Sequence, residues 1–212
     1  MVDAREHWDD VYGLREVTQL GWYEETPEKS LELIDKCSIG KDERILDVGA
    51  GASTLIDNLV ERGFQDIIAV DISQEALKKS KERLGKKASS VGFIVDDLTR
   101  PKHLNKLRPI GLWHDRAVLH FLTEDKGRRA YLSALRHVVR AGGYVIIAAF
   151  SLEGAPKCSG LDVRRYDVNM IQEFLGNDFR LMEHFDHLYH MPSGDTRPYI
   201  YALFQRIKVS PT

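Results

Sequence analysis

The stretch ILDVGAGAST, Ile45–Thr54, decides the fold of this 212-residue chain. An apolar run reaches an acid at Asp47, passes two glycines at Gly49 and Gly51, and continues into apolar residues at helical spacing. A buried strand, a glycine turn and a helix in this order are typical of an α/β fold that binds a ligand at the turn. The neighbouring residues indicate which ligand that is.

The overall composition sets limits on the partners of the chain. There are 30 Lys and Arg against 32 Asp and Glu, a formal net charge of −2, which gives no general attraction to nucleic acid or anionic membranes. The longest apolar run, Tyr144–Phe150, is too short to cross a bilayer, and the start MVDAREHWDD lacks the apolar core of a secretory signal. We expect a cytoplasmic protein, monomer or weak homodimer, with no nucleic-acid or membrane partner.

Strand-like and helix-like segments alternate through the middle of the chain. Short β-branched runs predict strands at residues 44–49, 66–72, 91–97, within 110–118 and at 142–150. Amphipathic stretches predict helices from Leu55 to a stop at Gly63, from an N-cap at Ser73 to a stop at Gly85, and over most of 119–140. This alternation predicts parallel strands with helices on both faces.

The last part of the chain has a different pattern. Two strand-like runs, 179–192 and 197–208, flank the turn residues Ser193-Gly194-Asp195 and predict an antiparallel hairpin. The expected fold class is therefore α/β, a doubly wound, mostly parallel seven-stranded sheet with an antiparallel C-terminal edge hairpin. We expect one domain over 1–212: a cap or lid at 1–40 with a helix at 27–37, a ligand-binding core at 41–150, and a loop, helix and hairpin at 151–212.

The glycine turn lacks the residues of a phosphate site. A P-loop needs Lys followed by Ser or Thr after its glycines, and neither follows here. A dinucleotide fingerprint needs Gly or Ala where Thr54 stands, and Asp47 puts a negative charge beside any pyrophosphate. A cationic ligand suits this turn better.

Two further acids stand where strands end. Asp71 comes 20 residues after Gly51, the sequence separation at which an acid in this kind of fold accepts hydrogen bonds from ribose hydroxyls. Asp97 ends the next strand, with Asp96 beside it. Carboxyl ends of parallel strands meet in one crevice, so we expect these acids to converge. Carboxylates, bare backbone and no basic residue favour a nucleoside with an ammonium and a sulfonium, S-adenosylmethionine.

At this point the chain resembles a known family. LDVGAGAS resembles the D/E-x-G-x-G-x-G/S signature of class I S-adenosylmethionine-dependent methyltransferases, with Ser53 at the third glycine position. Asp71, Asp97 and HDRAVLHFL at 114–122 resemble its later motifs, and the likeness covers residues 45–150 closely. The first 40 residues resemble the cap of the small methyltransferase-like branch, which includes small-molecule and protein-lysine enzymes.

The resemblance implies a set of cofactor contacts. Asp47 helps to hold the ammonium, Asp71 accepts from both ribose hydroxyls, and Asp97 accepts from the adenine amino group. The alternative role of Asp71 and Asp97 is capping at strand–helix turns. The implied cofactor-binding residues are Tyr12, Trp22, Asp47, Gly49, Ala50, Gly51, Asp71, Ile72, Asp97, Leu98 and Asp115.

The resemblance also places acceptor and catalytic candidates after the fourth strand. Asp115 and His120 are the catalytic candidates; their alternatives are that Asp115 caps a helix or pairs with Arg116, and that His120 is a packing residue. The candidates for contacting the acceptor are His114, Arg116, Cys158, Arg165 and Tyr166. Three histidines, His184, His187 and His190, alternate along an expected strand, so we expect no metal site there.

The predicted function is methyl transfer from S-adenosylmethionine, by direct displacement, to a small-molecule acceptor. One alternative is a protein-lysine methyltransferase; others are an NAD(P)-dependent oxidoreductase on the same kind of fold and a non-catalytic cofactor-binding module. No Asn-Pro-Pro-Tyr/Phe sequence follows the fourth strand, which argues against nucleic-acid amino groups. A deep pocket closed by residues 8–23 and 158–166 favours a small acceptor, whereas an open groove favours a peptide.

Overall fold

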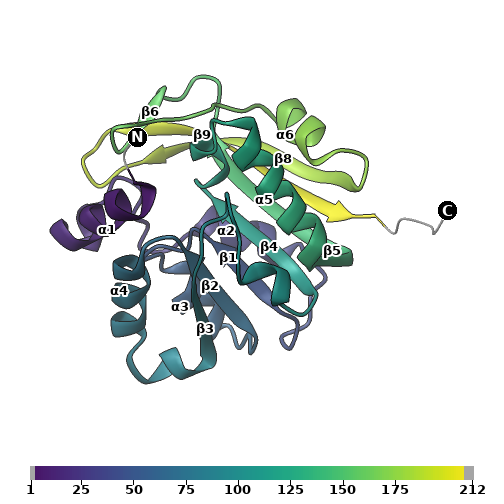
Figure 1. Cartoon of the computed structure of the whole chain (residues 1–212), viewed down its shortest axis with the longest axis horizontal. Helices are drawn as coiled ribbons and strands as arrows, with labels where there is room; N and C mark the ends of the chain where they lie inside the picture. Colours follow the sequence, from purple (N-terminus) through teal and green to yellow (C-terminus); the bar gives the residue numbers. More distant parts are fainter. Residues whose placement is uncertain (1–2, 208–212) are drawn as a thin grey trace.

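The described part of the chain, residues 3–207 of a computed structural model, is built around one seven-stranded sheet (Figure 1). The strand order is β3-β2-β1-β4-β5-β9-β8, with β1 to β5 parallel and the last two strands antiparallel, which confirms the predicted fold class. The strands are β1 (Ile45–Val48), β2 (Ile67–Asp71), β3 (Val91–Val95), β4 (Ile110–Arg116), β5 (Val139–Phe150), β8 (Phe179–His190) and β9 (Thr196–Arg206).

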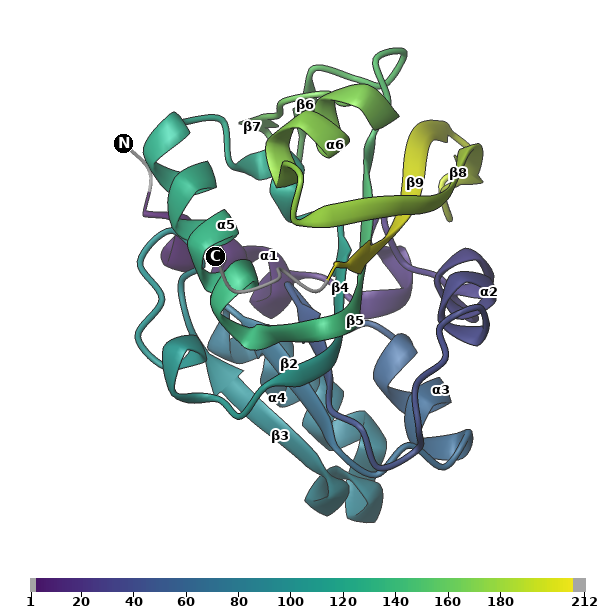
Figure 2. The same cartoon turned by 90° about the vertical axis from the view of Figure 1, so that its right-hand side faces the viewer.

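Helices cover both faces of the sheet (Figure 2). The helices are α1 (Ala4–Leu14), α2 (Glu28–Asp35), α3 (Leu55–Glu61), α4 (Gln74–Leu84), α5 (Asp125–Val138) and α6 (Val168–Leu175). Side chains of α2, α3 and α4 pack in one buried cluster, and those of α5 and α6 pack in another on the opposite face. None of the helices in this described part is long and apolar enough to cross a membrane.

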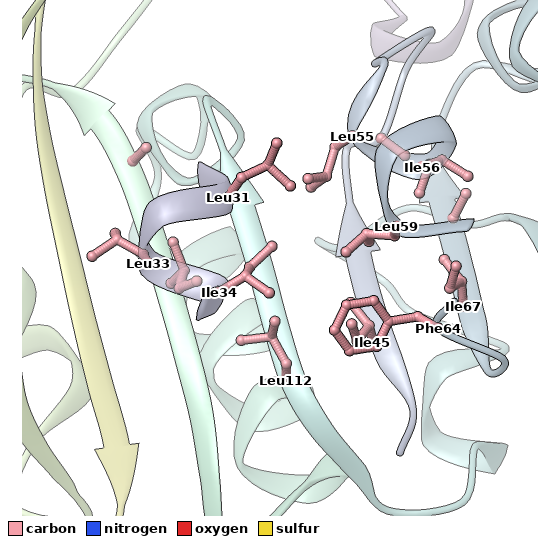
Figure 3. Packing of buried hydrophobic residues seen from close by; sticks show 14 of the residues in the cluster. Leu31, Leu33, Ile34, Ile45, Leu55, Ile56, Leu59, Phe64, Ile67 and Leu112 are labelled. Carbon is pink, nitrogen blue, oxygen red and sulfur yellow. The ribbon is translucent and has the colours of Figure 1, made fainter. Parts of the chain in front are cut away.

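The first strand shows why its sequence has no polar alternation. Ile45 belongs to the same buried cluster as Leu31 of α2 and Leu59 of α3 (Figure 3), while its neighbour Leu46 belongs to the cluster of α5. All four residues of β1 are buried because a parallel strand is covered on both faces. The two clusters hold the strand ends, and hence the turns after them, in fixed positions.

The helix from Ser73 to Gly85 forms as its sequence predicts. Ser73 is the N-cap of α4, and its Oγ accepts from the backbone N–H of Ala76 at 3.1 Å. Gly85 ends the helix at φ +56°, a conformation that favours glycine. Ser73 Oγ also donates to Asp9 of α1 at 2.7 Å, which ties the N-terminal helix to the sheet.

The boundary between the expected helix over 119–140 and the next strand was predicted wrongly. A short 3₁₀ turn at Leu119–Phe121 precedes α5, and β5 starts at Val139 instead of Gly142. Val138 and Val139 are both buried, so apolar spacing does not separate the helix end from the strand start. The pairing with β4 then shifts register on the way to Tyr144, across the glycine pair that was expected to begin the strand.

Several further elements differ from the sequence pattern. The start of the chain was given no element, yet it forms α1, capped by Asp3, whose carboxylate accepts from Arg5 N–H at 2.8 Å. A two-residue ribbon, β6 (Lys157–Cys158) with β7 (Leu161–Asp162), folds the loop after β5 and was not predicted. The hairpin turn at 193–195 lies between β8 and β9 as predicted; Lys208, the end of the expected second run, lies outside the described residues.

We predict that Ser73→Ala lowers the free energy of unfolding by about 1–2 kcal/mol, because it removes the α4 cap and the bond to Asp9. Urea denaturation checks the value. Ser89→Ala, at an exposed serine bonded only to the nearby Lys86 carbonyl, is the control and stays within about 0.5 kcal/mol of the parent. Equal losses in both variants would contradict the capping account.

Candidate active site

Two adjoining cavities lie at the carboxyl ends of the parallel strands. The larger cavity reaches from the ends of β2 and β3 to β9 and the β6–β7 ribbon; the smaller cavity lies against the glycine turn. Tyr12, Trp22, Gly49 and Arg116 line both cavities. The two cavities form a crevice where the strand order of the parallel part of the sheet reverses, between β1 and β4. Open parallel sheets bind their ligands at this position.

The turn between β1 and α3 requires its two glycines. Gly49 and Gly51 have φ of +62° and +54°, where other residues are strained. A side chain at Gly49 would overlap Val118, and one at Gly51 would overlap the Tyr12 hydroxyl. The space beside these glycines is already filled by Val118 and Tyr12, so the turn accepts no larger residue at either position.

Asp71 links this turn to the end of β2. Its Oδ2 accepts from Gly51 N–H and its Oδ1 accepts from Ser73 N–H, each at 2.8 Å. The side chain is buried at the larger cavity, and burial raises its pKa to about 6. Each carboxylate oxygen keeps one acceptor position for a ligand hydroxyl. The side chain that caps α4 is that of Ser73 and not that of Asp71. Helix capping therefore does not use up the acceptor positions of Asp71.

Asp47 has one satisfied and one unsatisfied oxygen. Its Oδ1 lies 2.6 Å from His114 Nδ1, and His114 Nε2 lies 2.9 Å from Ser30 Oγ. Its Oδ2 is buried and has no hydrogen-bond partner among the described residues. Asp47 lines the smaller cavity, and a carboxylate oxygen without a partner favours a cationic ligand group beside it. His114, expected to contact the acceptor, lines the smaller cavity and orients Asp47.

The end of β3 carries a pair of acids with different surroundings. Asp97 Oδ1 accepts from the Thr99 backbone and hydroxyl at 2.8 and 2.7 Å, and its side chain lines the larger cavity. Asp96 is buried and accepts from the backbone N–H groups of residues 102–104. The sequence indicates no role for Asp96; the structure shows that it holds the loop after β3 in place. Ile72 and Leu98 line the larger cavity and Ala50 lines the smaller one.

Asp115 and His120, the expected catalytic pair, line neither cavity. Asp115 is fully buried and accepts from Val118 N–H, Leu119 N–H and the Tyr131 hydroxyl at 2.8, 3.1 and 2.6 Å. These are the contacts of a capping residue. His120 Nδ1 accepts from Phe150 N–H at 3.3 Å, and burial lowers its pKa to about 3. The geometry thus favours the structural alternative for both residues.

The acceptor candidates on the loop after β5 separate into two groups. Cys158 lines the larger cavity together with Leu161, because the β6–β7 ribbon turns them toward the strand ends. Arg165 and Tyr166 do not line it. Arg165 donates to the carbonyls of Leu152 and Gly154, and the backbone of Tyr166 pairs with Ser151 while its ring is buried. Those two residues hold the loop onto the sheet.

Arg116 is the acceptor candidate that lines both cavities. Its Nε donates to the Tyr201 hydroxyl at 3.1 Å and lies 3.0 Å from Glu24 Oε2, and its Nη1 donates to the Trp22 carbonyl at 3.0 Å. Tyr199 lies beside it at the larger cavity. Glu24 and Tyr199 were not singled out from the sequence, because only the folded hairpin and N-terminal segment bring them to the end of β4.

An aromatic cluster of the N-terminal segment covers the crevice. Trp22 Nε1 donates to the Tyr12 hydroxyl at 3.2 Å, and the Trp8 ring meets the Trp22 ring edge-on at 5.7 Å. Thr54 and Tyr189 both donate to backbone carbonyls of residues 23–24. The predicted cofactor residues Tyr12 and Trp22 therefore lie over the glycine turn.

The histidines of β8 are arranged as an extended strand requires. His184 and His190 are exposed, whereas His187 is half-buried and its ring meets Tyr201 at 5.9 Å. Among residues 3–207 no group of three His, Cys, Asp or Glu side chains is placed to share a metal ion.

Comparison with known proteins finds similarity to methyltransferases over the central part of the chain. Residues 45–143 match the methyltransferase domain family. EEF1A lysine methyltransferase 2 of Mus musculus is 28% identical over 160 residues, which cover 69% of this chain and 65% of that protein, just under two thirds of its length.

Two solved structures share the fold. One comes from work on the conversion of a disulfide bond into a thioacetal group during echinomycin biosynthesis, with TM-score 0.78, 16% identity and coverage of 98% of this chain and 93% of the other. The second is a SAM-dependent methyltransferase from Anabaena variabilis, with TM-score 0.77, 14% identity and coverage of 97% and 96%. Together these findings support a class I S-adenosylmethionine-dependent methyltransferase domain.

The residues present fit that cofactor. The unpartnered Asp47 oxygen suits its ammonium, and the buried Asp71 carboxylate suits its ribose hydroxyls. Gly49 lines both cavities and carries no side chain of its own, so a ligand there can approach the backbone of the turn.

We predict that Gly51→Ala weakens binding of S-adenosylhomocysteine at least tenfold, because the new methyl group overlaps the Tyr12 hydroxyl and strains the turn. Gly63→Ala is the matched control: Gly63 has φ +83° and open space around it, so it brings backbone strain alone. Calorimetric titration of both folded variants measures the difference. Equal affinities would show that the turn does not contact the cofactor.

Proposed function

We propose that this protein transfers a methyl group from S-adenosylmethionine to a small-molecule acceptor. The observation that carries the proposal is the buried, unpartnered oxygen of Asp47 beside a glycine turn that has a second carboxylate, Asp71, on its other side. A pyrophosphate would meet negative charge at this place, whereas a nucleoside with an ammonium would be stabilised.

Roles follow for the residues around the turn. Asp47 holds the amino group, with His114 and Ser30 fixing its orientation, and Asp71 accepts from the ribose hydroxyls. Asp97 and the backbone of Leu98 take the adenine edge at the larger cavity. When bound, the cofactor supplies an already activated methyl group, so the protein has to align the acceptor and exclude water. Trp8 and Trp22 cover the crevice and exclude water.

Among the described residues, the acceptor end of the larger cavity offers no group suited to general-base catalysis. Burial raises the pKa of Cys158 to about 11 and raises that of Tyr199 well above its usual range. Asp115 and His120 line neither cavity. We therefore propose an acceptor atom that already carries a free lone pair near neutral pH.

The size of the acceptor is inferred from the walls of the larger cavity. Residues of the N-terminal segment, Trp8 and Trp22, face residues of the β6–β7 ribbon, Cys158 and Leu161, across it. Closure from these two sides supports a small acceptor. The second candidate is methyl transfer to a lysine of a protein, which the name of the mouse relative favours.

Asp71 gives a pH test of the cofactor site. Because burial raises its pKa to about 6, it gains a proton between pH 7.5 and 5 and accepts less strongly from hydroxyls. We predict that S-adenosylhomocysteine binds about three- to tenfold more weakly at pH 5 than at pH 7.5. The stability of the fold changes in the opposite direction. An acid whose pKa is higher in the folded than in the unfolded protein binds its proton more tightly when folded, so the free energy of unfolding rises as pH falls through about 6.

Asp71→Ala completes this test. We predict a loss of about 2–4 kcal/mol in cofactor binding at pH 7.5 and no remaining pH dependence between 5 and 7.5. Asp35→Ala, at an exposed carboxylate paired with Arg62, is the control and keeps both the affinity and the pH profile. If a folded Asp71→Ala variant bound the cofactor as tightly as the parent protein, Asp71 would hold the glycine turn and make no contact with the cofactor.

An acceptor screen distinguishes the two candidate functions. The protein is incubated with methyl-labelled S-adenosylmethionine and with cell extract, once complete and once depleted of macromolecules. We expect label in the small-molecule fraction of both extracts. Label confined to a protein band would support the lysine alternative, and label in nucleic acid would contradict both candidates.

A further inference from the structure

The guanidinium of Arg116 has one buried NH2 group, Nη2, for which the described chain supplies no hydrogen-bond acceptor. Its Nε and Nη1 are held by Tyr201, Glu24 and the Trp22 carbonyl. Its Nη2 is buried and makes no hydrogen bond to any described atom. A buried donor without a partner costs about 1–3 kcal/mol, so such groups commonly mark a ligand position.

The contacts of Arg116 place this group on the acceptor side of the crevice. The guanidinium lies over the rings of Tyr189 in β8 and Tyr199 in β9, at 5.1 and 5.3 Å from their centres. Both strands lie beyond β5, away from β1 to β3, whose ends carry the cofactor candidates. Arg116 thus extends from the end of β4 toward the antiparallel edge, where Cys158 and Leu161 complete the wall.

The charges along the larger cavity are separated. Its acidic lining residues Asp71, Asp96 and Asp97 are all at the ends of β2 and β3. Arg116 is the one basic side chain among the described residues that line it. Around it the wall is aromatic and apolar, with Trp22, Tyr199 and Leu161.

We propose that the methyl acceptor is a small organic carboxylate whose carboxylate group binds Nη2 of Arg116. A carboxylate accepts a charge-assisted hydrogen bond from a guanidinium, and the aromatic wall takes its apolar body. This inference rests on the proposed methyl transfer and names the acceptor class for it.

The same arrangement disfavours a lysine side chain. An ammonium at this end of the larger cavity meets the positive charge of Arg116, and the nearest carboxylate, Glu24, already pairs with that arginine at 3.0 Å. Like charges at close range oppose binding in a buried site. The acceptor class therefore separates the two candidate functions.

The experiment titrates matched pairs of probes into protein saturated with S-adenosylhomocysteine. Benzoate, phenylacetate and 3-phenylpropionate are compared with their primary amides by calorimetry. We expect at least one carboxylate to bind tenfold or more tightly than its amide. Arg116→Gln abolishes this preference and Arg116→Lys keeps part of it, while Arg197→Gln, at another arginine near Cys158, leaves it unchanged.

Two results would overturn the inference. The first is that no carboxylate outcompetes its amide in the parent protein. The second is that Arg116→Gln weakens S-adenosylhomocysteine but not 5′-methylthioadenosine, which lacks the amino-acid part; the carboxylate at Arg116 then belongs to the cofactor. Failure of the proposed function is seen separately, as no binding of S-adenosylhomocysteine to the parent protein. Thermal unfolding of each variant verifies that it is folded.

Discussion

The hydrogen bond from Gly51 N–H to Asp71 Oδ2 joins the turn after β1 to the end of β2, and the site depends on it. It requires a carboxylate that is buried at a strand end and a glycine at positive φ whose backbone comes close to it. With Asp47 held by His114 on the other side, the turn lies between two acids. That distribution of charge selects a cationic nucleoside over a dinucleotide before any acceptor enters.

The sequence predicts the parts of this arrangement that local chemistry determines. Glycines at positive φ, a serine cap and acids at strand ends each leave a signature within a few residues, and the structure has these features at Gly49, Gly51, Ser73 and Asp71. The parallel sheet follows from buried β-branched runs alternating with amphipathic helices. The helix–strand boundary at Val139 was missed, because buried residues on both sides of it show no change of period.

The acceptor side is less predictable because its residues come together only through long-range contacts. Arg116 meets Trp22, 94 residues earlier, and Tyr201, 85 residues later. The motif after β4 indicated the correct segment, but not which of its side chains turn toward the crevice. Asp115 and His120 face the interior, and Arg116 between them reaches the cavity. The sequence pattern of this segment does not indicate which side chains face the interior and which face the cavity.

The central claim, that the turn holds S-adenosylmethionine and not a dinucleotide, is tested most directly by calorimetric titration of the parent protein at pH 7.5. Parallel titrations use S-adenosylhomocysteine, which carries the same adenosine and amino-acid groups, and NAD. The account predicts saturable one-to-one binding of S-adenosylhomocysteine in the micromolar range and binding of NAD at least a hundredfold weaker. Saturable binding of NAD with no heat from S-adenosylhomocysteine would contradict it.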